Sequence, residues 1–165
     1  MTAAKSMDEP LHICTMCGEQ KTADQVWFLL AESHWDDRLR ILQWQDEVAQ
    51  RRGIHRACCP EHVQEMVIHW MATGSLDFPF ATMWQVTPGA GMTLPVVLEP
   101  DTRGARQISE LAVHRESVRR VLAENPESLQ VILNELSSAL QRESETSSAR
   151  LETGQISRTG LLRLV

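Results

Sequence analysis

The stretches HICTMCG (residues 12–18) and CCPEH (residues 58–62) decide the fold of this chain. Each offers two metal-ligating side chains with two residues between them. A gap of two residues lets a tight backbone turn present both side chains to one ion, and structural zinc takes four nitrogen or sulfur ligands in a tetrahedron. We therefore predict one structural Zn²⁺, bound by Cys14, Cys17, Cys59 and His62.

Cys58 competes with Cys59 for the third position. Cys59 is the preferred ligand, because its spacing to His62 mirrors the first pair and places it directly before Pro60, where a helix can begin. Cys58 is then expected to be a small buried apolar residue, and a redox-active thiol beside the metal is the alternative. The sequence leaves open whether Cys58 replaces or supplements Cys59.

Composition sets limits on the rest of the chain. With 165 residues, 42% apolar and 23% charged, the chain can form a core. The net charge of -6 argues against a general electrostatic footprint for nucleic acid. The N-terminus lacks the apolar region of a signal peptide, and no apolar run is long enough for a membrane span, so a cytoplasmic protein is expected. In a reducing compartment, cysteines are interpreted first as metal ligands.

The secondary-structure signals follow the two ligand pairs. Residues 26–32 are rich in β-formers and 39–44 alternate in polarity, which predicts a β-hairpin around a polar turn at 33–38. A helix over 39–50 competes with the second strand, because the alternation is imperfect. Pro60, an apolar stripe at helical spacing and Gly74 predict a helix over residues 60–73.

The second half of the chain has a different pattern. Residues 86–105 are rich in proline and glycine and are predicted to be a linker. Residues 106–123 and 126–143 are predicted to form an amphipathic helical hairpin, which is too small to be stable alone and must pack on the zinc domain, on a second copy or on a partner. The full expected order is a flexible N-terminus (1–11), a zinc domain (12–85), the linker (86–105), the helical hairpin (106–143) and a disordered tail (144–165).

A Cys-x-x-Cys-Gly knuckle, a hairpin and a Cys-x-x-His pair opening a helix together resemble the treble-clef zinc finger, over roughly residues 12–73. The resemblance implies an α+β fold in which Cys14, Cys17, Cys59 and His62 hold a structural zinc ion. Functions attached to this family range over nucleic-acid binding, protein interaction and nuclease chemistry. The motif therefore specifies a fold better than an activity.

Two other functions have candidate residues. A treble-clef nuclease of the His-Asn-His type needs a second metal site, for which His34, His55 and His69 are available, but the family's Asp-His pair and asparagine are missing. A nucleic-acid-binding regulator would use the only basic cluster near the ligands, formed by Arg51, Arg52 and Arg56.

The leading expectation is a non-enzymatic zinc-binding protein. Its helical hairpin would mediate self-association or docking to a protein partner, without contact to a membrane. Among the tryptophans, Trp27, Trp44 and Trp70 are expected in the core, whereas Trp35 and Trp84 are candidates for contact with a partner.

Overall fold

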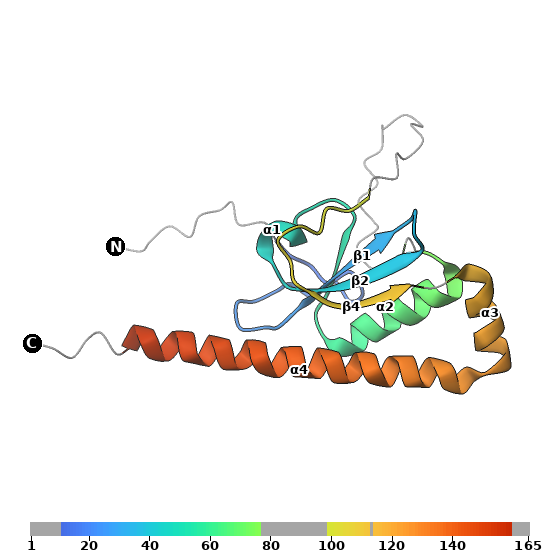
Figure 1. The fold of residues 1–165 in the computed structure, drawn as a ribbon. Coiled ribbons are helices and arrows are strands. Elements are labelled where there is room, and N and C mark those ends of the chain that lie inside the picture. Colours follow the sequence, from blue (N-terminus) through green and yellow to red (C-terminus); the bar gives the residue numbers. More distant parts are fainter. Residues whose placement is uncertain (1–10, 77–98, 113, 160–165) are drawn as a thin grey trace, which may run out of the picture.

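The computed structural model describes residues 11–76, 99–112 and 114–159, and it shows an α+β protein built on one four-stranded antiparallel sheet (Figure 1). The strands are β1 (Phe28–Ser33), β2 (Arg38–Gln43), β3 (Ile54–Ala57) and β4 (Gln107–Ala112), and their order in the sheet is β3-β1-β2-β4. The helices are α1 (Asp46–Ala49), α2 (Pro60–Thr73), α3 (Arg115–Glu124) and α4 (Pro126–Thr159).

The central hairpin of β1 and β2 confirms the prediction of two strands. Leu30 pairs with Ile41, and both side chains belong to the core between the sheet and helices α2, α3 and α4. Leu29 pairs with Leu42 in a smaller core on the opposite face, where α1 covers the sheet (Figure 1). Because both faces are covered, the strands carry apolar residues at successive positions, which explains their imperfect alternation.

Helix α2 begins and ends where its sequence signals predict. Cys59 is the N-cap in an extended conformation, Pro60 occupies the first turn and needs no N–H partner, and Gly74 ends the helix in the left-handed conformation with φ 79°. Its apolar stripe lies against the sheet. Because α2 begins at Pro60, His62 lies in its first turn. The packing of α2 on the sheet holds His62 in place relative to β3.

The prediction of a helix over 106–123 is wrong in its first half, because residues 107–112 form β4 beside β2. The two apolar residues Ile108 and Leu111 are three apart, which mimics helical spacing. The register against β2 shifts between Ile41, which pairs with Ser109, and Leu42, which pairs with Gln107. This bulge lets Ile108 and Leu111 pack against the same core although they are an odd number of positions apart.

Helices α3 and α4 form a hairpin that packs on the rest of the protein. Their buried residues Val118, Leu133, Leu136 and Leu140 belong to the same core as the sheet and α2. Gln64 of α2 donates a hydrogen bond to Ser137 of α4. Of the three places the sequence allowed for this hairpin to pack, the structure shows packing on the sheet and α2 of its own chain.

Helix α4 also extends further than predicted. It was expected to end at residue 143 and to be followed by a disordered tail, but it continues to Thr159. Elongating an existing helix is far easier than nucleating one, and no proline interrupts residues 144–159.

The predictions for residues 1–10, 77–98 (with Trp84 and most of the linker) and 160–165 lie outside the described residues. Among the helices described, none has the length and apolar character needed to cross a membrane.

Candidate metal centre

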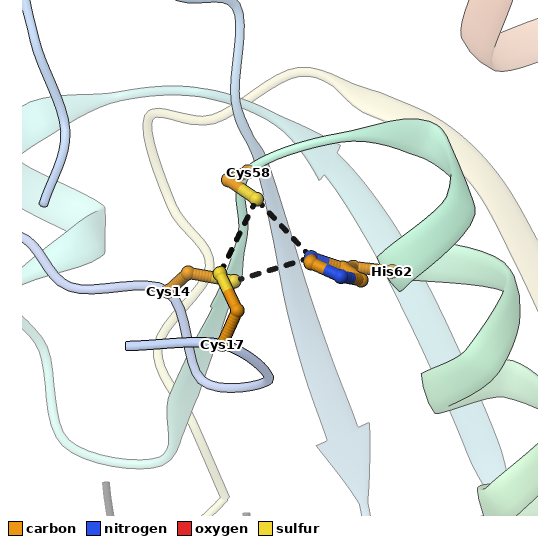
Figure 2. A group of neighbouring side chains, drawn as sticks. All are labelled: Cys14, Cys17, Cys58 and His62. Carbon is orange, nitrogen blue, oxygen red and sulfur yellow. Dashed lines mark hydrogen bonds between the residues drawn. The ribbon is translucent and has the colours of Figure 1, made fainter. Parts of the chain in front are cut away.

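Four side chains from two distant segments converge at one end of the sheet (Figure 2). Cys14 and Cys17 come from the knuckle loop, residues 12–20, which precedes β1. Cys58 directly follows β3, and His62 lies in the first turn of α2. Their potential ligand atoms all lie within 4.8 Å of one another. The cluster is therefore a candidate site for one metal ion.

The spacing of these atoms fits a tetrahedral zinc site. Zn–S bonds of about 2.3 Å and Zn–N bonds of about 2.0 Å place two sulfur ligands about 3.8 Å apart, and sulfur and nitrogen about 3.5 Å apart. Cys17 Sγ lies 3.7 Å from Cys58 Sγ, and His62 Nδ1 lies 3.7 Å from Cys14 Sγ and 3.1 Å from Cys58 Sγ. These three distances lie within about 0.4 Å of the tetrahedral values.

The structure brings Cys58, and not Cys59, into the four-residue group. This placement differs from our preference for Cys59. Successive residues of an extended chain point to opposite sides, and Cys59 is extended with φ -155°. Cys59 lies outside the four-residue group, although its side chain interacts with that of Cys58. The alternation of β3 is the signal that would have favoured Cys58, since Arg56, two residues earlier, directs its side chain toward the knuckle loop.

The knuckle loop has its own hydrogen bonds and a glycine that closes it. Cys14 N donates to Glu19 O at 2.8 Å, and Gly18 N donates to Cys14 O at 3.0 Å. Gly18 has φ 75°, a conformation that costs other residues energy. The loop is thereby folded back so that Cys14 and Cys17 face the same point.

Arg56 attaches the knuckle loop to the sheet. Its carbonyl oxygen accepts from Thr15 N at 2.8 Å, and its own N–H donates to Thr15 Oγ1 at 3.0 Å. Its guanidinium donates to the carbonyl oxygens of Ile13 and Ala49, each at 3.0 Å. One residue thus connects the knuckle loop, β3 and α1.

Electrostatics separates Cys14 from the other thiols. Burial alone would raise the pKa of Cys14, but hydrogen bonds from the backbone N–H groups of Cys17, Met16 and Cys58, and one from His62, outweigh it and lower the pKa below its ordinary value. Burial raises the pKa of the Cys58 thiol strongly, and the charge of Cys14 raises it further. The lowered pKa favours the thiolate form of Cys14, which is the form that binds a cation.

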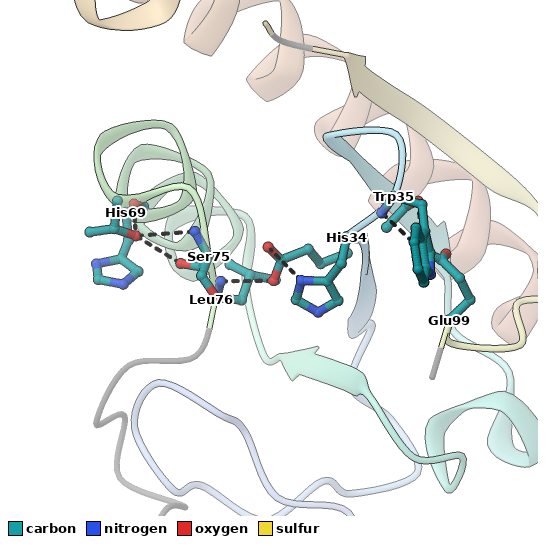
Figure 3. A network of polar contacts seen from close by, with 9 residues as sticks. His34, Trp35, His69, Ser75, Leu76 and Glu99 are labelled. Carbon is teal, nitrogen blue, oxygen red and sulfur yellow. Dashed lines mark hydrogen bonds and ion pairs between the residues drawn. The ribbon is translucent and has the colours of Figure 1, made fainter. Parts of the chain in front are cut away.

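The histidines considered for a second, catalytic metal do not form such a group in the described part of the chain. His34 Nδ1 lies 3.7 Å from the buried carboxylate of Glu32, which also accepts a hydrogen bond from Leu76 N at 2.9 Å (Figure 3). His69 lies on α2, where its backbone carbonyl accepts from Thr73, and His55 lies on β3. In the described part of the chain, only the Cys14–Cys17–Cys58–His62 group brings together three or more metal-ligating side chains.

The basic cluster is used largely within the protein. Arg51 donates to the carbonyl oxygens of Asp101 and Arg103 and lies 3.6 Å from the Asp101 carboxylate. Arg56 is occupied as described above, and Arg52 is exposed. A phosphate backbone would find one exposed guanidinium here, which is a weak electrostatic footprint.

Comparison of the chain with protein-family models, with curated proteins and with solved structures found no match. Functional inference therefore rests on the geometry of the site itself.

Proposed function

We propose that this is a non-enzymatic zinc-binding protein in which one Zn²⁺, held by Cys14, Cys17, Cys58 and His62, fastens a treble-clef-like domain that serves as a platform for a protein partner. The convergence of three thiols and one imidazole carries this proposal, since this donor set suits structural zinc.

The number of donors supports a structural role for the ion. Four protein ligands complete a tetrahedron and leave no position for water or substrate, whereas catalytic zinc keeps one position open. With three thiolates and a neutral imidazole, the site carries a net charge of about -1. Arg56, close to Cys14, and the N-terminus of α2 both stabilise that charge.

The order of elements supports the treble-clef-like description. A knuckle loop is followed by the hairpin of β1 and β2, and then by α2, whose first turn carries the last ligand. The metal would connect segments 41 residues apart in sequence, as Cys17 and Cys58 are. Such a long connection stabilises the folded chain by lowering the entropy of the unfolded one.

The decisive experiment compares two neighbouring cysteines. Zinc content is measured by elemental analysis for the wild-type protein, Cys58→Ser and Cys59→Ser, together with far-ultraviolet circular dichroism before and after a chelator. We expect about one zinc per chain in the wild type and in Cys59→Ser, and a loss of zinc affinity of at least about 100-fold in Cys58→Ser.

Other results of this comparison have clear meanings. Loss of zinc from Cys59→Ser, with retention in Cys58→Ser, would restore Cys59 as the ligand. A wild-type protein that binds no zinc, and whose spectrum is unchanged by chelator, would refute the proposal.

A further inference from the structure

The turn between β1 and β2 exposes the side chain of a tryptophan. Trp35 is 78% exposed, whereas Trp27 and Trp70 are buried in the cores. A tryptophan side chain can bury about 150–250 Å² of surface, so leaving one in water forgoes a large hydrophobic gain. The apolar stripe of the helical hairpin is already covered within the chain. Within the described part of the chain, the Trp35 side chain is therefore largely left exposed to solvent.

The turn that presents Trp35 is held in place on both sides. Glu99 Oε1 accepts hydrogen bonds from Ser33 Oγ at 2.9 Å and from Trp35 N at 3.3 Å (Figure 3). On the other side, His34 lies beside the buried carboxylate of Glu32. The backbone of Trp35 is thus fixed before any partner arrives, which lowers the entropic cost of binding.

The charge around the turn is predominantly negative. Asp36 and Asp37 follow Trp35 directly, and Glu99 lies beneath the turn. The nearest arginine in sequence, Arg38, is paired with Glu110 of β4 at 3.2 Å. Arg119 of α3 lines a small pocket together with Asp37, and it offsets part of this charge. Asp36, which follows Trp35 in the sequence, is exposed.

We propose that the Trp35 turn, residues 33–37, is a contact surface for a cationic segment of a protein partner, in which an arginine side chain lies on the indole and its guanidinium faces the exposed Asp36. A guanidinium stacks on an aromatic face and pairs with carboxylates at the same time. This inference deepens the partner-binding part of the proposed function, and it does not depend on the metal.

A matched pair of peptides tests the proposal on the full-length protein. The probes are Ac-Gly-Arg-Gly-Arg-Gly-NH₂ and the same peptide with citrulline in place of both arginines, which keeps the shape and removes the charge. Binding is followed by the indole N–H resonance of Trp35, assigned with Trp35→Phe. We expect a saturable shift with the arginine peptide, weakened at least fivefold for the citrulline peptide, which corresponds to about 1 kcal/mol.

Variants separate the turn from the general acidity of the protein. Asp36→Asn is expected to weaken binding of the arginine peptide at least fivefold. The control is Glu65→Gln, which removes one exposed charge elsewhere and is expected to leave binding unchanged. Zinc content and circular dichroism confirm that each variant is folded.

Three results would overturn the proposal. The first is an equal response of Trp35 to both peptides, and the second is no response to either one. The third is self-association of the chain that disappears in Trp35→Leu, because a second copy would then be the natural occupant of the turn. Since the wild-type protein alone distinguishes the two peptides, the test remains valid even if a variant fails to fold. Failure here with zinc still bound would leave the metal part of the proposed function intact.

Discussion

At Arg56, one side chain and its backbone hold the knuckle loop beside the candidate metal centre. Four hydrogen bonds connect this residue to Thr15, Ile13 and Ala49, and its guanidinium interacts with the charge of Cys14. Groups that orient metal ligands affect a site nearly as strongly as the ligands themselves. Arg56 is thus a positioning residue for the centre.

Replacing Arg56 tests this role without removing a ligand. We expect Arg56→Gln to lose zinc to a competing chelator about 10-fold to 100-fold faster than the wild type, because the loop is less well held and the anionic site less well balanced. Arg52→Gln, an exposed arginine nearby, is the matched control and should release zinc at the wild-type rate. Release is followed with a colorimetric zinc indicator, and equal rates for the two variants would rule out the role.

Glu32 is a buried acid whose partner is a backbone N–H group. It is 4% exposed, and its Oε2 accepts from Leu76 N at 2.9 Å. We expect Glu32→Ala to lower the free energy of unfolding by about 1–3 kcal/mol, because Leu76 N would lose its acceptor in a buried place. Glu32→Gln keeps an oxygen acceptor and should cost less in urea denaturation. An alanine variant as stable as the glutamine variant would contradict this account.

At this scale, the sequence identified most of the candidate site. Cys14, Cys17 and His62 were predicted to share one site, and all three lie in the four-residue group. Choosing between Cys58 and Cys59 required the direction of a side chain at the end of a strand. Spacing to His62 allowed either residue, so the strand's alternation had to be known first.

Among the helices and strands, the prediction succeeded for α2, which depends on local sequence signals, and failed for β4, which depends on pairing with a distant strand. Helix α2 carries its own start and stop signals, so its limits agreed with the prediction. The sequence of β4 contains no local signal that distinguishes a strand from a helix. It is a strand because β2 offers a row of unpaired backbone groups, and because Arg38 and Arg40 both pair with Glu110 across the two strands. Such pairing lies outside any local window of sequence.

The packing of α4 on the sheet gives a prediction at this scale. Leu140 is fully buried in the main core, whereas Val131 of the same helix is 61% exposed. We expect Leu140→Ala to lower the free energy of unfolding by about 2–5 kcal/mol, because it leaves a cavity. Val131→Ala should change it by less than about 0.5 kcal/mol. Both are measured by urea denaturation, and a mild effect at Leu140 would show that α4 does not dock as described.

For the whole molecule, zinc affinity should depend on pH in one direction. The pKa of Cys58 is raised in the metal-free protein, chiefly by burial, so this thiol keeps its proton at neutral pH and must release it when zinc binds. We expect zinc affinity to rise with pH across the neutral range and to fall in acid. Calorimetry of zinc binding in buffers with different ionisation enthalpies measures the protons released, and a value of zero would contradict the expectation.

The hydrogen bonds between the knuckle loop and β3 have a consequence for the tendency of the protein to aggregate. Strand β3 is one of the two edge strands of the sheet, and Thr15 N donates to the carbonyl oxygen of Arg56. The loop therefore covers an edge that would otherwise invite strands of other molecules. If the ion holds the loop there, chelation should expose this edge, and light scattering should show the protein aggregating in a concentration-dependent manner. The metal would then keep molecules apart from one another, in addition to holding one molecule together.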